Sequence, residues 1–238
     1  MNLLLLHASD FIAPDRVRID DYRFIHLKKI IKIVTGERIK AGLLNGNIGY
    51  AEVEQQNNDY IELTVKLTEQ PPVALNVHLV LALPRPKMLK RIFQTISAMG
   101  VKQLSLIHSA RVEKSYWQTP WLQADKMNQH LLLGLEQAQD TVLPQVHFYQ
   151  RFKPFVEDVL PGLAIGRQAV VAHPGQGDFC LQQVNRQQPA ILAVGPEGGF
   201  SDYEVKKFIQ AGFNRCQMGE RILRVENAVP VLLGRLLY

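Results

Sequence analysis

The segment Gly195-Pro196-Glu197-Gly198-Gly199 carries the residue types that most clearly allow chemistry on a bound ligand. Glycines let the backbone approach a ligand closely and leave its N–H groups open to it. No Gly-Lys-Ser or Gly-Lys-Thr follows, and the spacing is not Gly-x-Gly-x-x-Gly, so the segment does not fit a nucleoside triphosphate site. Taken alone, it fits equally well a tight turn whose glycines only satisfy backbone geometry.

A strand and a helix must hold this glycine segment in place. Residues 190–194 form a continuous apolar run of strand length, which is typical of a strand covered on both faces. Ser201 and Glu204 form a capping box, which predicts a helix that begins near Asp202 and ends at Gly212. The glycine segment therefore lies at the carboxyl end of a strand, where open α/β sheets bind their ligands.

A second segment with a glycine and two arginines precedes the end of the chain. Met218-Gly219 follows the last short strand, and residues 221–224 lead into an apolar helix over 226–237. Glu226 near the start of this helix suits the helix dipole. Because proline is tolerated only in the first turn, Pro230 predicts that the helix begins a little after Glu226.

The net charge of +5 is concentrated near the N-terminus. Residues 16–40 contain eight basic side chains and three acids, an excess equal to the net charge of the whole chain. Such a segment favours a polyanionic partner, most often a nucleic acid, although a solvated helix face with incidental lysines gives the same pattern. The predicted RNA contacts in this segment are Arg16, Arg23, Lys28 and Lys32.

The pattern of expected strands and helices changes near residue 72, and this change predicts two domains. Residues 1–72 hold short strand-like runs separated by Asn45-Gly46-Asn47 and Asn57-Asn58-Asp59, with a helix over 21–33, which indicates a small antiparallel β-barrel. Residues 73–238 alternate strands and helices, including a long helix over 120–140. This alternation predicts an α/β domain with a mostly parallel sheet and helices on both faces.

The remaining composition places the chain in the cytoplasm. The N-terminal apolar run has no basic segment before it and no small-residue cleavage site, so it fits a strand better than a signal peptide. No apolar run approaches membrane-spanning length. Cys180 and Cys216 match no metal-ligand spacing and fit buried thiols in a reducing compartment, so no metal site is expected.

The two C-terminal segments together resemble those of a known family. "AVGPEGGFS" followed by "MGERILRVENA" is similar to the paired motifs of the 16S ribosomal RNA uridine-N3 methyltransferases, which belong to the SPOUT superfamily. "LALPRPKMLKRIFQTISAMGV", "VVAHPG", "HLKKIIK" and "NGNIGYAEV" agree with the same family, so the resemblance covers essentially the whole chain. It implies a SPOUT α/β fold with a C-terminal trefoil knot, an N-terminal PUA-like RNA-binding barrel, and a homodimer that binds S-adenosylmethionine and 16S ribosomal RNA.

This resemblance assigns roles to residues in both segments. Twelve residues are expected to bind the cofactor: Ala172, His173, Leu192, Val194, Gly195, Pro196, Gly198, Gly199, Met218, Gly219, Ile222 and Leu223. Methylation of uridine N3 requires loss of the N3 proton, and a fixed cation stabilises the charge left on the uracil. Arg224 is the first choice for this cation. Arg221 is the second, with contact to an RNA phosphate as its alternative role. Glu197 either accepts the N3 proton or holds the loop by hydrogen bonds.

The sequence also departs from the family pattern at several positions. Thr95, Ala98 and Asn227 replace residues that are usual in the family, and Lys32 replaces an arginine. These changes leave two alternatives open: a SPOUT methyltransferase for another ribosomal or transfer RNA position, and an RNA-binding homologue without catalysis.

Overall fold

A computed structural model describes residues 2–174, 184–185 and 187–237, with the side chains of residues 236 and 237 left aside. The chain forms two compact units. The first comprises Met1–Val73 together with Leu132–Leu143, and the second comprises Ala74–Leu131 and Pro144–Tyr238. No helix of the described part of the chain is both long and apolar enough to cross a membrane.

The N-terminal unit is built on one six-stranded sheet. Its strands are β1 (Leu4–Leu6), β2 (Phe11–Ala13), β3 (Arg16–Ile19), β4 (Arg38–Leu43), β5 (Ile48–Gln56) and β6 (Ile61–Glu69). They lie in the order β1-β4-β5-β6-β3-β2. The sheet is antiparallel except for the pair β1–β4, which is parallel. The sequence did not predict this parallel pair, because β1 is too short to indicate its direction.

The strands of this unit alternate between an apolar interior and a polar exterior. In β5, Ala51 and Val53 are buried, whereas Tyr50 and Glu52, which alternate with them, are exposed. One cluster of buried side chains takes residues from β1, β3, β4, β5 and β6, so the sheet curls around this cluster. Asn45, with a φ of 59°, lies in the connection between β4 and β5, as the Asn-Gly signal predicts.

The helical segment of this unit is less regular than the sequence predicts. Instead of one helix over 21–33, α1 (Tyr22–His26) passes into a π-helical turn, η2 (Leu27–Ile31). The Asp21 side chain accepts a hydrogen bond from the Arg23 backbone N–H and begins α1. Lys32 takes a left-handed conformation with a φ of 58° and ends the segment. A single short 3-10 turn, η1 (Ala8–Asp10), separates β1 from β2.

The second unit contains a six-stranded parallel sheet, as predicted. Its strands are β7 (Leu75–Ala82), β8 (Val101–Ile107), β9 (Gln145–Tyr149), β10 (Gln168–Ala172), β11 (Ala190–Val194) and β12 (Asn214–Cys216). They lie in the order β12-β10-β11-β7-β8-β9, and every neighbouring pair is parallel. All five residues of β11 are buried, which agrees with its continuous apolar sequence.

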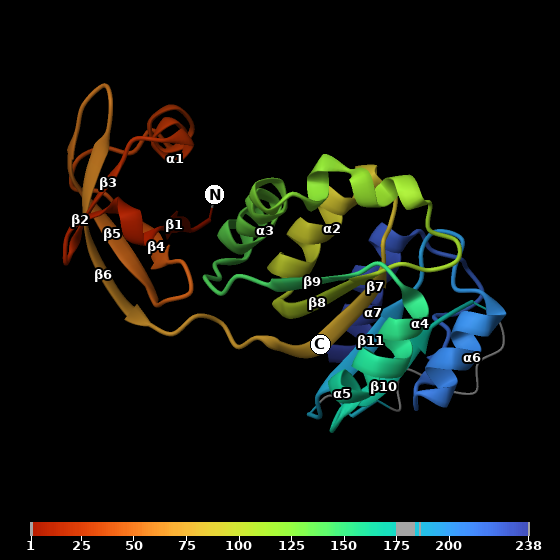
Figure 1. Cartoon of the computed structure of the whole chain (residues 1–238). Helices are drawn as coiled ribbons and strands as arrows, with labels where there is room; N and C mark the ends of the chain where they lie inside the picture. The colour runs from red at the N-terminus through yellow and green to blue at the C-terminus, as the bar shows by residue number, and fades with distance from the viewer. Residues whose placement is uncertain (1, 175–183, 186, 238) are drawn as a thin grey trace. The chain divides into compact units, whose positions relative to one another are not determined.

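Helices pack on both faces of this sheet. The helices from this part of the chain are α2 (Pro86–Ala98), α3 (Ala124–Ala138), which belongs to the first unit from Leu132 onward, α4 (Phe152–Pro154), α5 (Leu160–Ala164), α6 (Asp202–Gln210) and α7 (Val225–Leu237), with shorter turns η3 (Lys114–Gln118), η4 (Pro120–Leu122) and η5 (Phe155–Val159). In Figure 1, α4 and α5 lie in front of the strands and α7 lies behind them. The carboxyl ends of the parallel strands are thereby left for the loops that build the site.

Two helix predictions in this unit were wrong in detail. The helix expected over 120–140 begins only at Ala124, because Pro120 and the residues before it form the 3-10 turns η3 and η4. Helix α7 begins at Val225, before Glu226, and keeps Pro230 in its interior. The ring of Pro230 lacks an N–H, so the Glu226 carbonyl loses its helical donor without ending the helix. The trefoil knot that the resemblance implies stays a prediction.

Candidate cofactor site at the carboxyl ends of β10, β11 and β12

A cavity of about 290 Å³ lies at the carboxyl ends of three neighbouring parallel strands, β10, β11 and β12. Its lining comes from residues 172–174 after β10, residues 194–197 and Gly199 after β11, residues 216–223 after β12, and Val225, Ala228 and Leu232 of α7. Parallel strands place such loops at one edge of the sheet. The cavity therefore combines the two glycine-containing segments that the sequence singles out.

The loop from Gly195 to Gly199, here called the glycine loop, is a tight turn. The Gly199 N–H donates to the Pro196 carbonyl at 2.7 Å, and Gly199 has a φ of 72°. A Cβ atom at Gly195 would lie 2.9 Å from the Phe200 nitrogen. Gly195 is therefore required by close backbone approach, whereas Gly199 is required by its left-handed conformation.

Two hydrogen bonds tie the glycine loop to other segments of the chain. Glu197 Oε1 accepts a hydrogen bond from the Arg85 backbone N–H at 2.9 Å, which ties the glycine loop to the loop after β7. Arg111, in the loop after β8, donates from Nη1 to the Gly198 carbonyl. Behind the loop, the capping box of α6 is formed as predicted, with the Ser201 side chain on the Glu204 N–H and the Glu204 side chain on the Ser201 N–H.

His173 forms a second wall of the cavity. Its backbone N–H donates to the Cys216 carbonyl at 2.9 Å, which joins the ends of β10 and β12. Its Nδ1 atom is buried and has no hydrogen-bond partner within the described part of the chain. Burial, together with the positive charge of Arg215, lowers the pKa of His173. The ring is therefore neutral at pH 7 and keeps one nitrogen for a ligand.

The third wall is the segment between β12 and α7. Gly219 has a φ of 123°, and Arg235 of α7 donates to the Met218 carbonyl at 3.3 Å. Arg221 lies on the cavity lining, whereas Arg224 does not. Arg224 is the exposed residue before α7, and its carbonyl accepts hydrogen bonds from the backbone N–H groups of Asn227 and Ala228.

All predicted cofactor residues except Leu192 and Gly198 line the cavity. Leu192 is fully buried in the middle of β11, below the loop. Gly198 faces the Arg111 side chain, because a Cβ atom there would lie 3.0 Å from Arg111 Cδ. Val225, Ala228 and Leu232 were not predicted from the sequence, although their spacing of three and four residues is typical of one helix face. Arg111 was not predicted either, because no motif indicated it.

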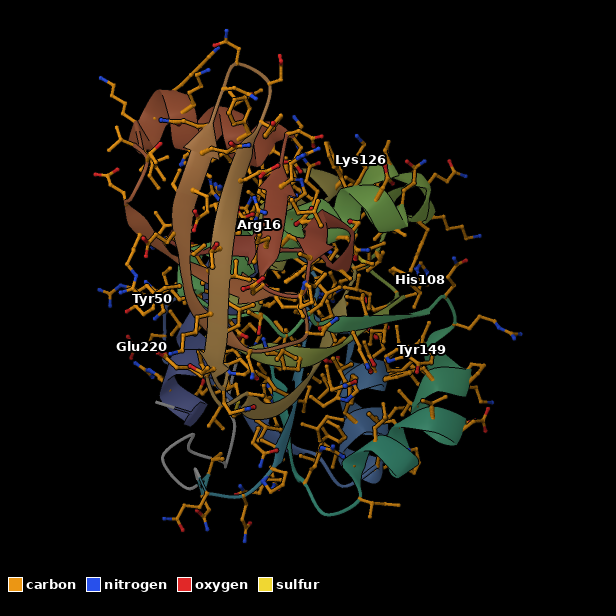
Figure 2. All side chains as sticks on the ribbon, turned by 90° about the vertical axis from the view of Figure 1, so that its left-hand side faces the viewer. Arg16, Tyr50, His108, Lys126, Tyr149 and Glu220 are labelled. Carbon is orange, nitrogen blue, oxygen red and sulfur yellow. The ribbon has the colours of Figure 1, made fainter. Side chains whose placement is uncertain are left out.

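The predicted RNA contacts of the N-terminal unit differ in their accessibility. Arg16 is exposed on β3 (Figure 2), and Lys28 and Lys32 follow in η2 and at its end. Arg23, by contrast, is only 3% exposed and donates to both Asp10 and Asp21, so its guanidinium belongs to the interior. Nowhere in the described residues do three or more metal-ligating side chains gather.

Comparisons with known proteins agree on one family. The model of the RNA methyltransferase domain family matches residues 70–237. The ribosomal RNA small subunit methyltransferase E of Treponema pallidum is 28% identical over 232 residues, which cover 96% of this chain and 87% of that protein. The methyltransferase E 1 of Borreliella burgdorferi is 23% identical over 96% of this chain and 94% of its own length.

Solved structures share the fold of this chain. The ribosomal RNA small subunit methyltransferase E of Neisseria gonorrhoeae, bound to S-adenosyl methionine, matches with a TM-score of 0.74 and 16% identity over 98% of this chain and 95% of its own. A methyltransferase of Legionella pneumophila in complex with the same cofactor matches with a TM-score of 0.72 and 20% identity over 99% and 97%.

Proposed function

This chain belongs to the RNA methyltransferase domain family, and we propose that it transfers a methyl group from S-adenosylmethionine to N3 of a uridine in the small-subunit ribosomal RNA. The observation that carries the proposal is the cavity between the glycine loop and the segment before α7. The names of the relatives from Treponema pallidum and Borreliella burgdorferi support the ribosomal RNA as substrate.

The residues of the cavity suit this cofactor. Val194, Leu223 and Leu232 supply apolar walls, and an added Cβ at Gly219 would meet no atom within 4 Å, so the backbone there is open to close approach. Small-molecule sites combine such walls with a few convergent polar groups. The buried Nδ1 atom of His173, which has no partner in the described residues, is one such group. When bound, S-adenosylmethionine supplies an electrophilic methyl group on its sulfonium.

A cation beside the uracil would make N3 reactive. As the N3 proton leaves, negative charge spreads over the flanking carbonyl oxygens, and the freed lone pair forms the new N–C bond while the C–S bond breaks. A preorganised positive charge stabilises this anion. We assign this role to Arg221, because it lies on the cavity lining and Arg224 does not. Arg224, exposed before α7, is the second choice.

The proposed role of Glu197 is to position the glycine loop. Its carboxylate already accepts the Arg85 N–H at 2.9 Å, and this bond joins the loops after β7 and β11. A proton acceptor for N3 is better sought in His173, which lines the cavity and whose buried Nδ1 atom has no hydrogen-bond partner among the described residues.

Three of the departures from the family pattern lie outside the lining of the cavity. Thr95, Ala98 and Asn227 are not among the residues that line the cavity. This supports catalysis over the alternative of an RNA-binding homologue that has lost it. A methyltransferase for another ribosomal or transfer RNA position stays the second candidate, because those three changes can alter the RNA target.

Two measurements test the proposal. Calorimetric titration with S-adenosylmethionine should show one site per chain, and a protein that binds no cofactor would be a non-catalytic RNA binder. Mass-spectrometric mapping of ribosomal RNA from a deletion strain should then show one uridine that has lost a methyl group from N3. Loss of a different modification would move the assignment to the second candidate.

The N-terminal unit is proposed to position the RNA without taking part in the chemistry. The proposed RNA contacts of this unit are Arg16, Lys28 and Lys32. Arg23 is excluded because it is buried. Charge reversal of the three to Glu should weaken RNA binding and flatten its salt dependence, with the cofactor affinity unchanged. Equal RNA affinity of this triple variant would place the binding surface elsewhere.

We further propose a cytoplasmic homodimer. Ile222 before α7 is 79% exposed and Val231 within it is 38% exposed, so apolar side chains remain uncovered near this helix. Light scattering at micromolar concentration should give the mass of two chains, and a monomer would contradict the proposal.

A further inference from the structure

A second basic segment lies in the methyltransferase unit, hidden by the charge balance of the chain. Residues 84–118 contain seven basic side chains and a single acid, Glu113. This excess of six exceeds the net charge of +5 of the whole chain, and acids elsewhere offset it. The net charge of the chain therefore does not reveal that residues 84–118 are as basic as residues 16–40.

Helix α2 gathers part of this charge on one face. Lys90 and Arg91 lie three and four residues after Lys87, which places all three on one side of the helix, and α2 carries no acid. Lys87 and Arg91 are exposed, and Lys90 Nζ lies 3.7 Å from the centre of the Trp121 ring. The opposite face of α2 is buried through Leu89, Ile92, Phe93 and Ile96.

The loop after β8 continues this basic face to the edge of the sheet. The loop leaves β8 beside β9, where the His108 N–H donates to the Tyr149 carbonyl at 2.8 Å (Figure 2). Arg111 and Lys114 of this loop are exposed. The Tyr116 hydroxyl bonds Glu113 at 3.1 Å and also interacts with the Arg85 side chain. The one acid of the segment is therefore already engaged by Tyr116.

The basic face meets the cofactor cavity at the glycine loop. The cavity lies on the side of this loop that faces β10 and β12, whereas Arg85 and Arg111 approach it from the loops after β7 and β8, which lie on the other side of β11 in the sheet order. The Arg85 backbone N–H bonds Glu197, and Arg111 bonds the Gly198 carbonyl. Among the described residues, Arg111 donates this one hydrogen bond from Nη1, and the residue is exposed.

We propose that this α2–β8 basic surface (Arg85, Lys87, Lys90, Arg91, Arg111 and Lys114) binds the phosphate backbone of the RNA strand that flanks the target nucleotide. The proposal rests on the proposed function, since it names where that substrate lies on the methyltransferase unit. Arg85 and Arg111 hold phosphates next to the glycine loop, and the lysines of α2 follow the strand away from it. Guanidinium groups suit phosphate because they donate two parallel hydrogen bonds.

Conservative substitutions separate charge from structure. Arg111→Gln keeps the stem on Gly198 and an N–H donor for its carbonyl, and Arg85→Gln leaves the backbone bond to Glu197 intact. Arg167→Gln is the matched control, because Arg167 also donates to a backbone carbonyl, that of Leu163 at 2.8 Å, but at the amino end of β10. Fluorescence anisotropy with a labelled single-stranded oligouridylate, over a range of salt concentrations, measures RNA affinity for each protein.

The double variant R85Q/R111Q should bind this RNA roughly tenfold more weakly, and the slope of log K against log salt should fall by about 1.4, the loss of two single-strand phosphate contacts. R167Q should match the wild type in both. Wild-type affinity and slope in R85Q/R111Q would overturn the proposal. If R111Q also changes the cofactor affinity in calorimetry, the RNA binding of the single variant R85Q tests the proposal instead. Its slope of log K against log salt should fall by about 0.7.

This experiment tests the proposed RNA-binding surface independently of the proposed methyl transfer. A wild-type protein that binds no S-adenosylmethionine would refute the proposed function, whereas the salt dependence of oligouridylate binding is measured without the cofactor. Unchanged RNA binding in the double variant, with methyl transfer intact in the wild type, would refute only the surface.

Discussion

The glycine loop depends on two glycines for different physical reasons, and these can be separated by mutation. We expect Gly195→Ala to lower stability by about 1–3 kcal/mol, because its Cβ would lie 2.9 Å from the Phe200 nitrogen and the backbone must shift. The shift should also weaken S-adenosylmethionine binding, since Gly195 lines the cavity. Urea unfolding and calorimetric titration measure the two effects.

Gly162→Ala is the control for this substitution. Gly162 lies in α5, where an added Cβ would meet no atom within 4 Å. Alanine should raise stability there by up to about 1 kcal/mol, because glycine loses more backbone entropy in a helix. A Gly195→Ala protein as stable as the wild type, with equal cofactor affinity, would show that the loop tolerates a side chain.

The two arginines before α7 differ in position and should differ in effect. Arg221→Ala should reduce methyl transfer by roughly 10²–10³, the usual loss when one preorganised charge is removed, with cofactor binding retained. Arg224→Ala should cost less, since Arg224 is not on the cavity lining. The Arg221 defect should shrink at higher pH, where hydroxide assists loss of the N3 proton. Single-turnover rates across pH test this, and the reverse ranking would return the role to Arg224.

At the scale of elements, the sequence predicted those features that are determined by residues close together in the chain. The apolar run of β11 and the capping box of α6 are local signals, and both are present in the structure. The π-helical turn after α1 and the interior Pro230 of α7 were not predicted, because packing overrides the local preference there. Arg111 could not be found either, since its partner Gly198 is 87 residues away in the sequence.

The start of α6 holds a loop as well as its own helix. Glu204 is buried, and its carboxylate accepts the Ser201 N–H at 2.8 Å and the Ala110 N–H at 2.7 Å. Glu204→Gln places an NH₂ group against one of these donors and should cost about 1–3 kcal/mol. Ser201→Ala removes only the cap and should cost about 1 kcal/mol. Urea unfolding should rank them in this order, and a smaller loss in Glu204→Gln would contradict the double role.

A buried histidine links β7 to β8 and should make the sheet sensitive to acid. His78 Nε2 lies 2.9 Å from Ser105 Oγ, and burial, followed by the charge of Arg167, lowers the pKa of His78 to about 4 from its usual 6.5. The unfolded chain therefore binds this proton at higher pH than the folded one. Stability should fall by up to about 3 kcal/mol as the pH drops from 6.5 to 4.

The variant His78→Gln isolates this effect. Its amide can still bond Ser105 but does not titrate between pH 4 and 6.5. Urea midpoints measured across this range should decrease less in the variant than in the wild type. Parallel curves for the two proteins would assign the acid sensitivity to other groups.

At the scale of the whole molecule, the N-terminal unit is not continuous in sequence. Residues 132–143 join it, and Leu135 packs in a cluster with Leu3, Leu5 and Ile48. The change of pattern near residue 72 does not indicate that residues 132–143 belong to the first unit, because by sequence these residues are an ordinary helix end. Long-range packing of this kind is not encoded in any local pattern.

A pair of leucines in α3 tests the contribution of this segment. Leu135→Ala should cost about 2–5 kcal/mol, since the side chain is fully buried in the cluster. Leu133→Ala, two residues earlier and 38% exposed, should change stability by less than about 0.5 kcal/mol. Urea unfolding measures both changes. A loss of stability in Leu135→Ala as small as that in Leu133→Ala would mean that the cluster adds nothing to the stability of the unit.

The late return of residues 132–143 has a consequence for the growing polypeptide. The six strands of the N-terminal unit leave the ribosome first, yet Leu3, Leu5 and Ile48 obtain their partner only when Leu135 has emerged. At about 5–20 residues per second, translation of the intervening chain takes several seconds. During that interval the side chains of Leu3, Leu5 and Ile48 lack the cover of Leu135, so the nascent barrel presents an apolar surface that a chaperone can bind.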